Sequence, residues 1–186
     1  PRSGKSTALK NAKLLLPEID VPKQGDGSTL NLDWWLYEQA IVLDTAGRYA
    51  VPDDSQRDKK EWSTLLGMLS RHKQKEPING IVLVVAANRL LEDTEEQLME
   101  ERRQVRASIN ELMEKREVKV PIYLMITKCD LVDGFKEWTD YLPEEARSQA
   151  MGHIHQGDIL NLDEHIDSIF DKIVDRIKDL RVLMLE

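Results

Sequence analysis

Two uninterrupted apolar runs constrain the fold of this chain most strongly: Ile81–Ala87 (IVLVVAA) and Val120–Ile126 (VPIYLMI). Neither run alternates with polar residues, so we expect both to be strands that are buried on both faces. Between them, Thr94 followed by Gln97 three residues on predicts a capping box and a charged helix that continues to about Lys115. A strand, a helix and a second strand in this order predict a parallel pair in an α/β fold.

A second pair of strands is expected earlier in the chain, at Leu30–Leu36 (LNLDWWL) and Ala40–Leu43 (AIVL). Only Tyr37-Glu38-Gln39 joins them, whereas parallel neighbours need a crossover of about a dozen residues or more. The pair must therefore be an antiparallel hairpin. Trp34 and Trp35 then face opposite sides of the hairpin. We expect one to pack in the core and the other to lie at a surface that a partner uses; the alternative is a purely structural role for both.

Helices complete the pattern. Helical spacing of apolar residues predicts a helix over Lys5–Leu16, which Pro17 closes, and another over Lys59–His72. A C-terminal amphipathic helix is expected over 163–186. Together these elements predict a single domain over residues 1–186, with a mostly parallel sheet between two helical layers and one antiparallel hairpin strand.

Composition excludes several classes of protein. The formal net charge of −8 argues against a dedicated nucleic-acid binder, which usually carries a basic face. The longest apolar run, Ile81–Ala87, is far shorter than the roughly 18 residues that a membrane-spanning helix needs. A single cysteine, Cys129, excludes an internal disulfide and fits a reducing compartment.

Three short motifs lie where such a sheet binds ligands: Gly4–Thr7 (GKST), Asp44–Gly47 (DTAG) and Thr127–Asp130 (TKCD). GKST opens a helix, whose free N–H groups favour phosphate. DTAG and TKCD follow strands, and TKCD has the [NT]-K-x-D form of a guanine-reading loop. In this order they predict a Ras-like P-loop NTPase fold. The expected nucleotide-binding residues are Gly4, Lys5, Ser6, Thr7, Gly47, Thr127, Lys128 and Asp130.

The chemistry of these residues predicts their roles. Lys5 can reach the outer phosphates of GTP or ATP, while the Ser6 hydroxyl and the Asp44 carboxylate can hold Mg²⁺. Thr29, in the loop after the first helix, is the better candidate of Ser28 and Thr29 for a further Mg²⁺ ligand. We expect Lys5, Asp44 and Arg48 to be the catalytic residues.

Arg48 stands where Ras-like enzymes carry a glutamine that orients water. A guanidinium has only donors, so two interpretations stay open: stabilisation of charge on the γ-phosphate, or a structural salt bridge. Signal-recognition GTPases also carry DTAGR and TKxD, but their DTAGR strand has no antiparallel hairpin partner of the kind expected here.

GKST is the second half of the pattern G-x-x-x-x-G-K-[ST]. The first half, and the strand that normally precedes it, would lie upstream of Pro1. We therefore interpret the chain as a fragment that lacks the first strand of the Ras-like sheet. That strand belongs between the DTAG strand and Ile81–Ala87, and we expect the 186-residue chain alone to bind nucleotide poorly.

The stretch Asn31–Tyr49 (NLDWWLYEQAIVLDTAGRY) closely resembles the cytoplasmic NTPase-like domain of the IcmF/TssM family. The likeness continues through Pro77–Gly80 (PING), Pro121–Asp130 (PIYLMITKCD) and Asp133–Phe135 (DGF). These proteins are inner-membrane components of type VI secretion systems, with relatives in type IVB systems. The resemblance implies a domain at the cytoplasmic face of the inner membrane, membrane segments absent from this chain, and a DotU/TssL-like partner.

Two further expectations follow. A docking module, in which the P-loop fold survives as a scaffold for cytoplasmic secretion components, is the alternative to an active NTPase. His153, His155, Asp158 and His165 match no familiar metal site by spacing, and we interpret them as part of a solvated loop.

Overall fold

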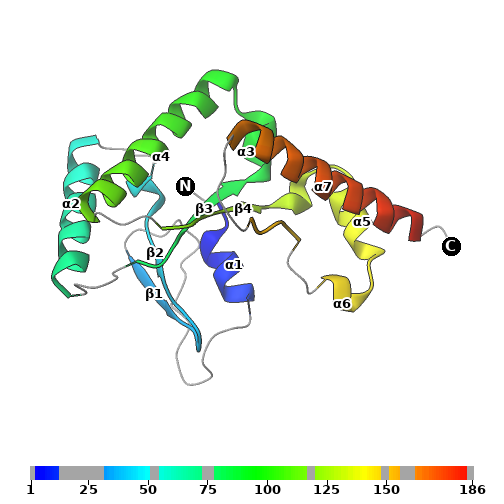
Figure 1. The fold of residues 1–186 in the computed structure, drawn as a ribbon, viewed down its shortest axis with the longest axis horizontal. Helices are drawn as coiled ribbons and strands as arrows, with labels where there is room; N and C mark the ends of the chain where they lie inside the picture. The colour runs from blue at the N-terminus through cyan, green and yellow to red at the C-terminus, as the bar shows by residue number, and fades with distance from the viewer. Residues whose placement is uncertain are drawn as a thin grey trace. The chain divides into compact units, whose positions relative to one another are not determined.

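A computed structural model describes residues 3–12, 32–50, 55–72, 78–116, 120–147, 151–155 and 162–183 (Figure 1). The chain divides into two compact units, Pro1–Asp133 and Gly134–Glu186. The first unit carries all three motifs. The predicted loop residues Ser28 and Thr29 lie outside the described residues, as does Pro17.

The predicted hairpin is confirmed. Strands β1 (Asp33–Leu36) and β2 (Ile41–Asp44) pair antiparallel, with Asp33 opposite Asp44 and Leu36 opposite Ile41. The amide of Tyr37 donates to the carbonyl of Ala40 at 2.8 Å and closes the turn. The two tryptophans divide as expected, because Trp35 is 0% exposed and Trp34 is 52% exposed.

The predicted parallel pair is also confirmed. Strands β3 (Ile81–Ala86) and β4 (Ile122–Thr127) pair in register from Ile81↔Ile122 to Ala86↔Thr127. The expectation that both strands are buried on both faces is wrong, because Val82 on β3 and residues 122–124 on β4 are exposed. The helix that contacts this pair most, α3 (Ala87–Glu92), packs on β3 and on the turn that follows β4, so it leaves much of β4 uncovered.

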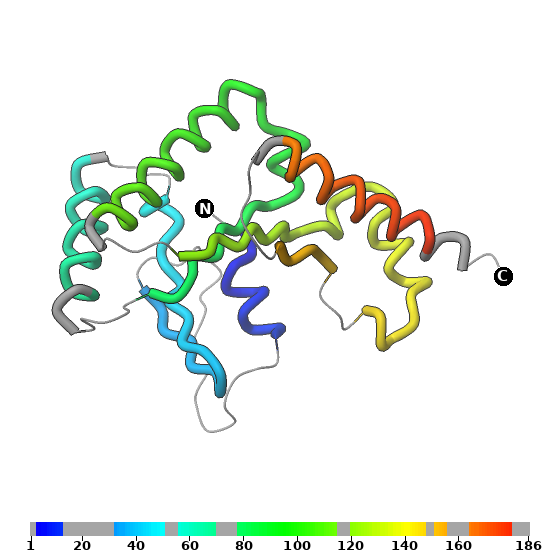
Figure 2. Tube along the Cα trace, viewed as in Figure 1, coloured from blue at the N-terminus to red at the C-terminus, as the bar shows by residue number. Residues whose placement is uncertain are grey.

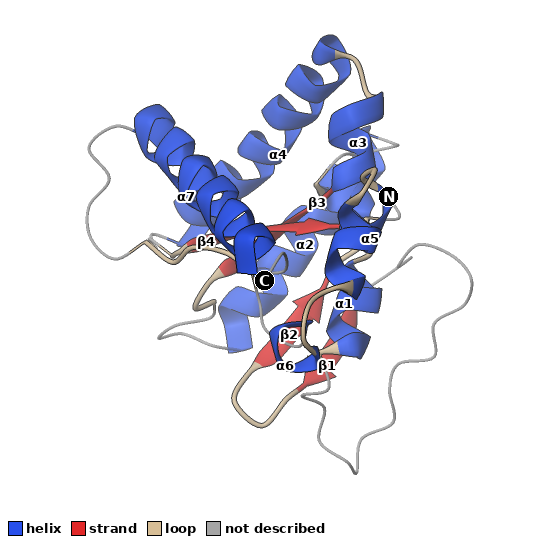
Figure 3. Cartoon of the chain, turned by 90° about the vertical axis from the view of Figure 1, so that its right-hand side faces the viewer, coloured by secondary structure: helices blue, strands red, loops and turns tan. Residues whose placement is uncertain are grey.

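The two strand pairs are separate sheets in the described part of the chain, as Figure 3 shows. Strand β2 is not hydrogen-bonded to β3 there. A direct β2–β3 pairing would have excluded the Ras-like strand order. That order therefore stays a prediction.

The remaining elements of the first unit are helices and short turns. Helix α1 spans Lys5–Asn11 and is followed by its C-cap Ala12, so the described part of this helix is shorter than the expected Lys5–Leu16. The others are α2 (Ser55–His72), α4 (Glu95–Arg116) and the 3-10 turns η1 (Gly47–Tyr49) and η2 (Cys129–Leu131). Helix α3 was not predicted, because its six residues follow β3 without a separating turn.

The start of α4 bears out the predicted capping box. The Thr94 amide donates to Gln97 Oε1 at 2.9 Å, and the Gln97 amide donates to Thr94 Oγ1 at 3.3 Å. Each side chain satisfies an amide that the first turn of a helix leaves free.

The core of the first unit lies around the hairpin and the ends of the strands. Helix α2 contacts η1 and α4, and α1 runs beside the hairpin, as the trace in Figure 2 shows. Among the described residues of this unit, the buried apolar side chains are Trp35, Tyr37, Ala46, Leu66, Ala86, Ala87 and Leu112.

The second unit contains α5 (Phe135–Asp140), α6 (Glu144–Arg147) and α7 (Leu162–Leu183). The predicted C-terminal helix is thus confirmed, and its apolar residues Ile166, Phe170 and Val174 are exposed. Within the described ranges, no helix has both the length and the apolar character to cross a membrane.

Candidate functional site

The GKST motif begins α1 with an unusual backbone conformation. Gly4 is the N-cap residue of α1 and has φ +79°, a left-handed conformation that side-chain-bearing residues rarely adopt. The Ala8 amide donates to the Gly4 carbonyl at 2.9 Å, so the helix closes its first turn on this glycine. Lys5 and Ser6 follow at once, on the first turn of the helix.

Asp44, at the end of β2, is the residue of DTAG that contacts GKST. Its side chain is almost fully buried, and the Lys5 ammonium lies 3.5 Å from its Oδ1. The Ser6 hydroxyl donates a hydrogen bond to its Oδ2. A buried carboxylate needs such partners, because burial disfavours an uncompensated charge. The first two motifs therefore meet at one carboxylate.

The TKCD motif reaches the same place from β4. The Thr127 hydroxyl donates to the carbonyl oxygen of Ser3 and lies 3.4 Å from the carbonyl oxygen of Val85. A Cβ on Gly4 would lie 3.7 Å from the Thr127 Cβ and 3.9 Å from the Lys128 Cγ. The Lys128 stem therefore lies beside the glycine of GKST.

Lys128 also has a strained backbone. Its φ of 55° makes it the one non-glycine residue with positive φ in the described part of the chain. Such conformations cost of order 1–3 kcal/mol and cluster at functional sites. Here the conformation turns the chain from β4 into η2 and places the Lys128 stem beside Gly4.

The structure thus brings together six of the predicted residues: Gly4, Lys5, Ser6, Asp44, Thr127 and Lys128. We call these six residues the motif cluster. Thr7 and Asp130 are both exposed, on α1 and η2, and Gly47 begins η1. Thr29 is outside the described residues, so its expected role stays a prediction.

Tyr37 is a neighbour of the motif cluster that the sequence did not reveal. Its hydroxyl donates to the Leu9 carbonyl of α1 at 3.0 Å and ties the hairpin turn to that helix. Burial, and secondly the Asp44 carboxylate, raise the pKa of the Tyr37 phenol. A tyrosine at the end of a strand can be interpreted as core or as a tether, so its sequence position alone carried no signal.

Arg48 is held by acids on α2. Its Nε lies 3.3 Å from Asp58 Oδ1, and its Nη2 donates to Glu61 Oε2 at 2.8 Å. This geometry favours the salt-bridge interpretation of Arg48 over the catalytic one. Asp58 and Glu61 were not predicted as partners, although their i,i+3 spacing places both on one face of a helix.

The donor set of the motif cluster fits Mg²⁺. A hydroxyl oxygen and a carboxylate oxygen, which Ser6 and Asp44 supply in mutual contact, are hard ligands of the kind that Mg²⁺ prefers beside substrate phosphates. Elsewhere in the described ranges, no three His, Cys, Asp or Glu side chains are arranged to hold a metal. The rings of His155 and His165 do contact each other, with centroids 4.1 Å apart.

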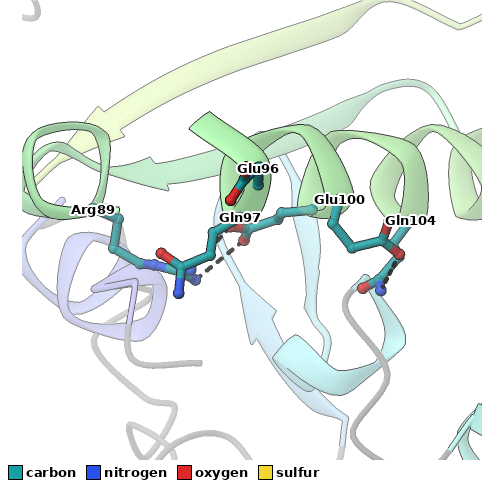
Figure 4. Close-up of a pocket in the computed structure, with 6 residues that line it drawn as sticks. Arg89, Glu96, Gln97, Glu100 and Gln104 are labelled. Carbon is teal, nitrogen blue, oxygen red and sulfur yellow. Dashed lines mark hydrogen bonds and ion pairs between the residues drawn. The ribbon is translucent and has the colours of Figure 1, made fainter. Parts of the chain in front are cut away.

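A hollow of about 390 Å³ lies along α3 and α4 and is lined by Arg89, Glu96, Gln97, Glu100, Glu101 and Gln104 (Figure 4). None of these residues belongs to the three motifs. Arg89 crosses from α3 to α4, where its Nη2 lies 3.2 Å from Glu101 Oε2. The hollow therefore lies between two helices that this ion pair connects.

Comparison with known proteins places this chain in a family. The family described as the IcmF-related N-terminal domain matches residues 55–186. A curated relative, the type VI secretion system component TssM1 of Pseudomonas aeruginosa, is 39% identical over 157 residues, which cover 82% of this chain and 14% of that protein. The chain therefore spans about a seventh of the relative's length. No solved structure matches it. With a family match over most of its length and a relative this similar, the chain belongs to the IcmF/TssM family.

Proposed function

We propose that this chain is a nucleotide-binding P-loop NTPase domain with a Ras-like fold. The single observation that carries the proposal is the motif cluster, in which GKST, DTAG and TKCD meet although they are far apart in the sequence. Strand pairing supports the Ras-like fold, because β1–β2 is antiparallel and β3–β4 is parallel. In this proposal a strand that precedes GKST lies between β2 and β3.

Each residue of the site has a role in the proposed chemistry. Lys5 and the amides at the start of α1 bind the phosphates, and Gly47 donates its N–H to the γ-phosphate. Ser6 and Asp44 hold Mg²⁺, which neutralises charge on the phosphates when it is bound. The aliphatic stem of Lys128 packs along the nucleotide base. Asp130, which is exposed at η2, accepts hydrogen bonds from the edge of a guanine.

The relative supports a wider proposal about the whole protein. We propose that the chain is part of a type VI secretion component and works at the cytoplasmic face of the bacterial inner membrane. Its membrane segments would belong to the parts of the protein beyond this chain, and a DotU/TssL-like protein would be its partner in the membrane. In this setting, nucleotide hydrolysis drives or switches assembly of the secretion complex.

One observation favours a second candidate function. The residue that stands in place of the water-orienting glutamine, Arg48, is bound to Asp58 and Glu61 of α2. A domain of this kind can bind nucleotide with little turnover and act as a docking module for cytoplasmic secretion components.

A titration of GTP and ATP with Mg²⁺ into the natural full-length protein tests both candidates. An NTPase domain binds one of the nucleotides, loses that binding in Lys5→Ala, and releases phosphate in single-turnover assays. A docking module either fails to bind or binds without phosphate release. Unchanged binding in Lys5→Ala would contradict the proposed site itself.

A further inference from the structure

Helix α1 carries Lys5 and Ser6, yet buried side chains do not hold it in place. None of its seven residues, Lys5–Asn11, is buried, and its apolar Leu9 is only half-buried. Most helices in proteins owe their stability and position to an apolar face that packs on the core. Because α1 lacks such a buried face, its position depends on polar contacts to a greater extent.

Polar contacts join α1 to the β1–β2 hairpin at two levels. At the start of the helix, Ser6 and Lys5 contact the Asp44 carboxylate, which lies at the end of β2. One turn later, the Tyr37 hydroxyl donates to the Leu9 carbonyl at 3.0 Å. The hairpin therefore fixes both the start of α1 and its following turn.

The Leu9 carbonyl is a suitable acceptor for an outside donor. It belongs to the last turn of α1, where a helix leaves carbonyls without good backbone partners. The Ala12 amide lies 3.3 Å from it and is shared with the Ala8 carbonyl at 3.0 Å. The Tyr37 hydroxyl thus supplies a hydrogen bond that the backbone of α1 makes only weakly.

Tyr37 is itself held firmly. Its side chain is 9% exposed, and its amide donates to the Ala40 carbonyl at 2.8 Å in the hairpin turn. It follows the fully buried Trp35 by two positions, so both side chains point to the same face of the hairpin. Burial, and secondly the Asp44 carboxylate, raise the pKa of the phenol, so it keeps the proton that it donates.

We infer that Tyr37 is a positioning residue of the proposed nucleotide site, because its hydroxyl holds α1 where Lys5 and Ser6 face Asp44. This role rests on the proposed function and deepens it. Lys5, Ser6 and Asp44 are the groups that the phosphates and Mg²⁺ would engage, so their mutual contacts would be shared with the ligand. The bond from Tyr37 to Leu9 uses none of these side chains and holds α1 in the same place before and after binding.

Tyr37→Phe tests this role, because it removes the hydroxyl and leaves the ring. In the natural full-length protein with Mg²⁺, we expect the nucleotide that the parent binds, GTP or ATP, to bind roughly 2- to 10-fold more weakly, as the loss of one hydrogen bond implies. In the nucleotide-free protein, the amides of α1 should exchange with solvent faster by a similar factor. The matched control is Tyr123→Phe, which removes a hydroxyl from a residue of β4 that is 52% exposed and should change neither quantity.

A double-mutant cycle separates positioning from a general loss of stability. Since Tyr37 acts through the residues at the start of α1, Tyr37→Phe should weaken nucleotide binding less in a Ser6→Ala background than in the parent. Equal losses in both backgrounds, or unchanged exchange of the α1 amides, would overturn the positioning role. A Tyr37→Phe protein that does not fold would overturn it as well, because the hydroxyl would then be a structural requirement of the core.

Failure of the proposed function gives a different result. A parent protein that binds neither GTP nor ATP overturns the nucleotide site, and the role of Tyr37 in it is then overturned too. Binding that Lys5→Ala abolishes but Tyr37→Phe leaves unchanged overturns the role of Tyr37 alone.

Discussion

The hydroxyl of Ser6 donates a hydrogen bond to the carboxylate of Asp44, although 38 positions separate the two residues in the sequence. Lys5 joins them at 3.5 Å from the other carboxylate oxygen. A hydroxyl and a carboxylate can hold Mg²⁺, and an ammonium beside them can bind the phosphates that the metal contacts. This contact is what joins GKST and DTAG into one candidate site.

Asp44→Asn should abolish most of the Mg²⁺ dependence of nucleotide affinity. The amide keeps the shape of the side chain but removes the negative charge that faces Lys5 and the metal. A hydrogen bond to a charged group is worth about 1.5–3 kcal/mol, so we expect an affinity loss of roughly 10- to 100-fold, measured by titration with and without Mg²⁺. Asp33, which pairs with Asp44 across the hairpin, supplies the control Asp33→Asn. Equal losses in both variants would refute the metal role.

Gly4→Ala should destabilise the fold. A Cβ at this position would meet Thr127 at 3.7 Å, an ordinary contact, so space does not decide the outcome. The φ of +79° does, since a left-handed backbone costs an L side chain roughly 1–2 kcal/mol. Denaturant unfolding should show a loss of about that size.

Gly67 provides a control of opposite sign for the Gly4 experiment. It lies inside α2 with nothing within 4 Å of an added Cβ. Gly67→Ala should therefore stabilise the fold by up to about 1 kcal/mol through helix propensity. A stabilising effect of Gly4→Ala as well would show that the backbone at Gly4 is not left-handed in solution.

Acidification should weaken the attachment of η1 to α2. Hydrogen bonds from Arg48, and secondly from Arg57, lower the pKa of the Glu61 carboxyl. A carboxyl with a lowered folded-state pKa stabilises the fold above its unfolded value of about 4.3, and that stability is lost as the pH falls through the folded-state value. Melting temperatures measured from about pH 6 down to about pH 3 should fall less in Glu61→Gln than in the parent. Parallel curves would mean that the Arg48–Glu61 pair has no net effect on stability.

Thr94→Ala should remove the cap of α4. The Thr94 hydroxyl accepts from the Gln97 amide, and loss of such a cap typically costs about 1 kcal/mol. Thermal unfolding measures the loss. The control is Thr64→Ala, because that hydroxyl lies inside α2 and donates to the Lys60 carbonyl without capping an end. A larger effect at Thr64 than at Thr94 would contradict the capping assignment.

Local signals explain why much of the fold was predictable. The three-residue connection forced the β1–β2 hairpin, and the capping box at Thr94 and Gln97 marked where α4 begins. The motif residues were found because each chemical group stands at a fixed spacing in its own element. These features depend on neighbours in the chain, so sequence patterns carry them.

Features that depend on partners distant in the chain were not predictable in the same way. The sequence left two interpretations of Arg48 open. Whether its guanidinium binds a phosphate or the acids of α2 depends on how η1 packs on α2, and sequence spacing does not give this packing. The exposure of β4 was missed, since an apolar run tells nothing of which helices cover it. The contact of Lys128 with Gly4 arises only when β4 and α1 meet.

The last prediction concerns the base. Asp130 is exposed in η2, next to the strained Lys128 that packs on Gly4, so its carboxylate is available to a base bound over the motif cluster. A site that reads hydrogen-bond donors discriminates strongly, because a wrong base leaves polar groups unpaired. We expect the natural full-length protein to bind GTP more tightly than ATP, and Asp130→Asn to weaken GTP binding while ATP binding stays the same. Asp133→Asn, just after η2, is the matched control and should leave both affinities unchanged. Equal affinities for GTP and ATP that Asp130→Asn does not alter would remove the basis for guanine recognition by TKCD.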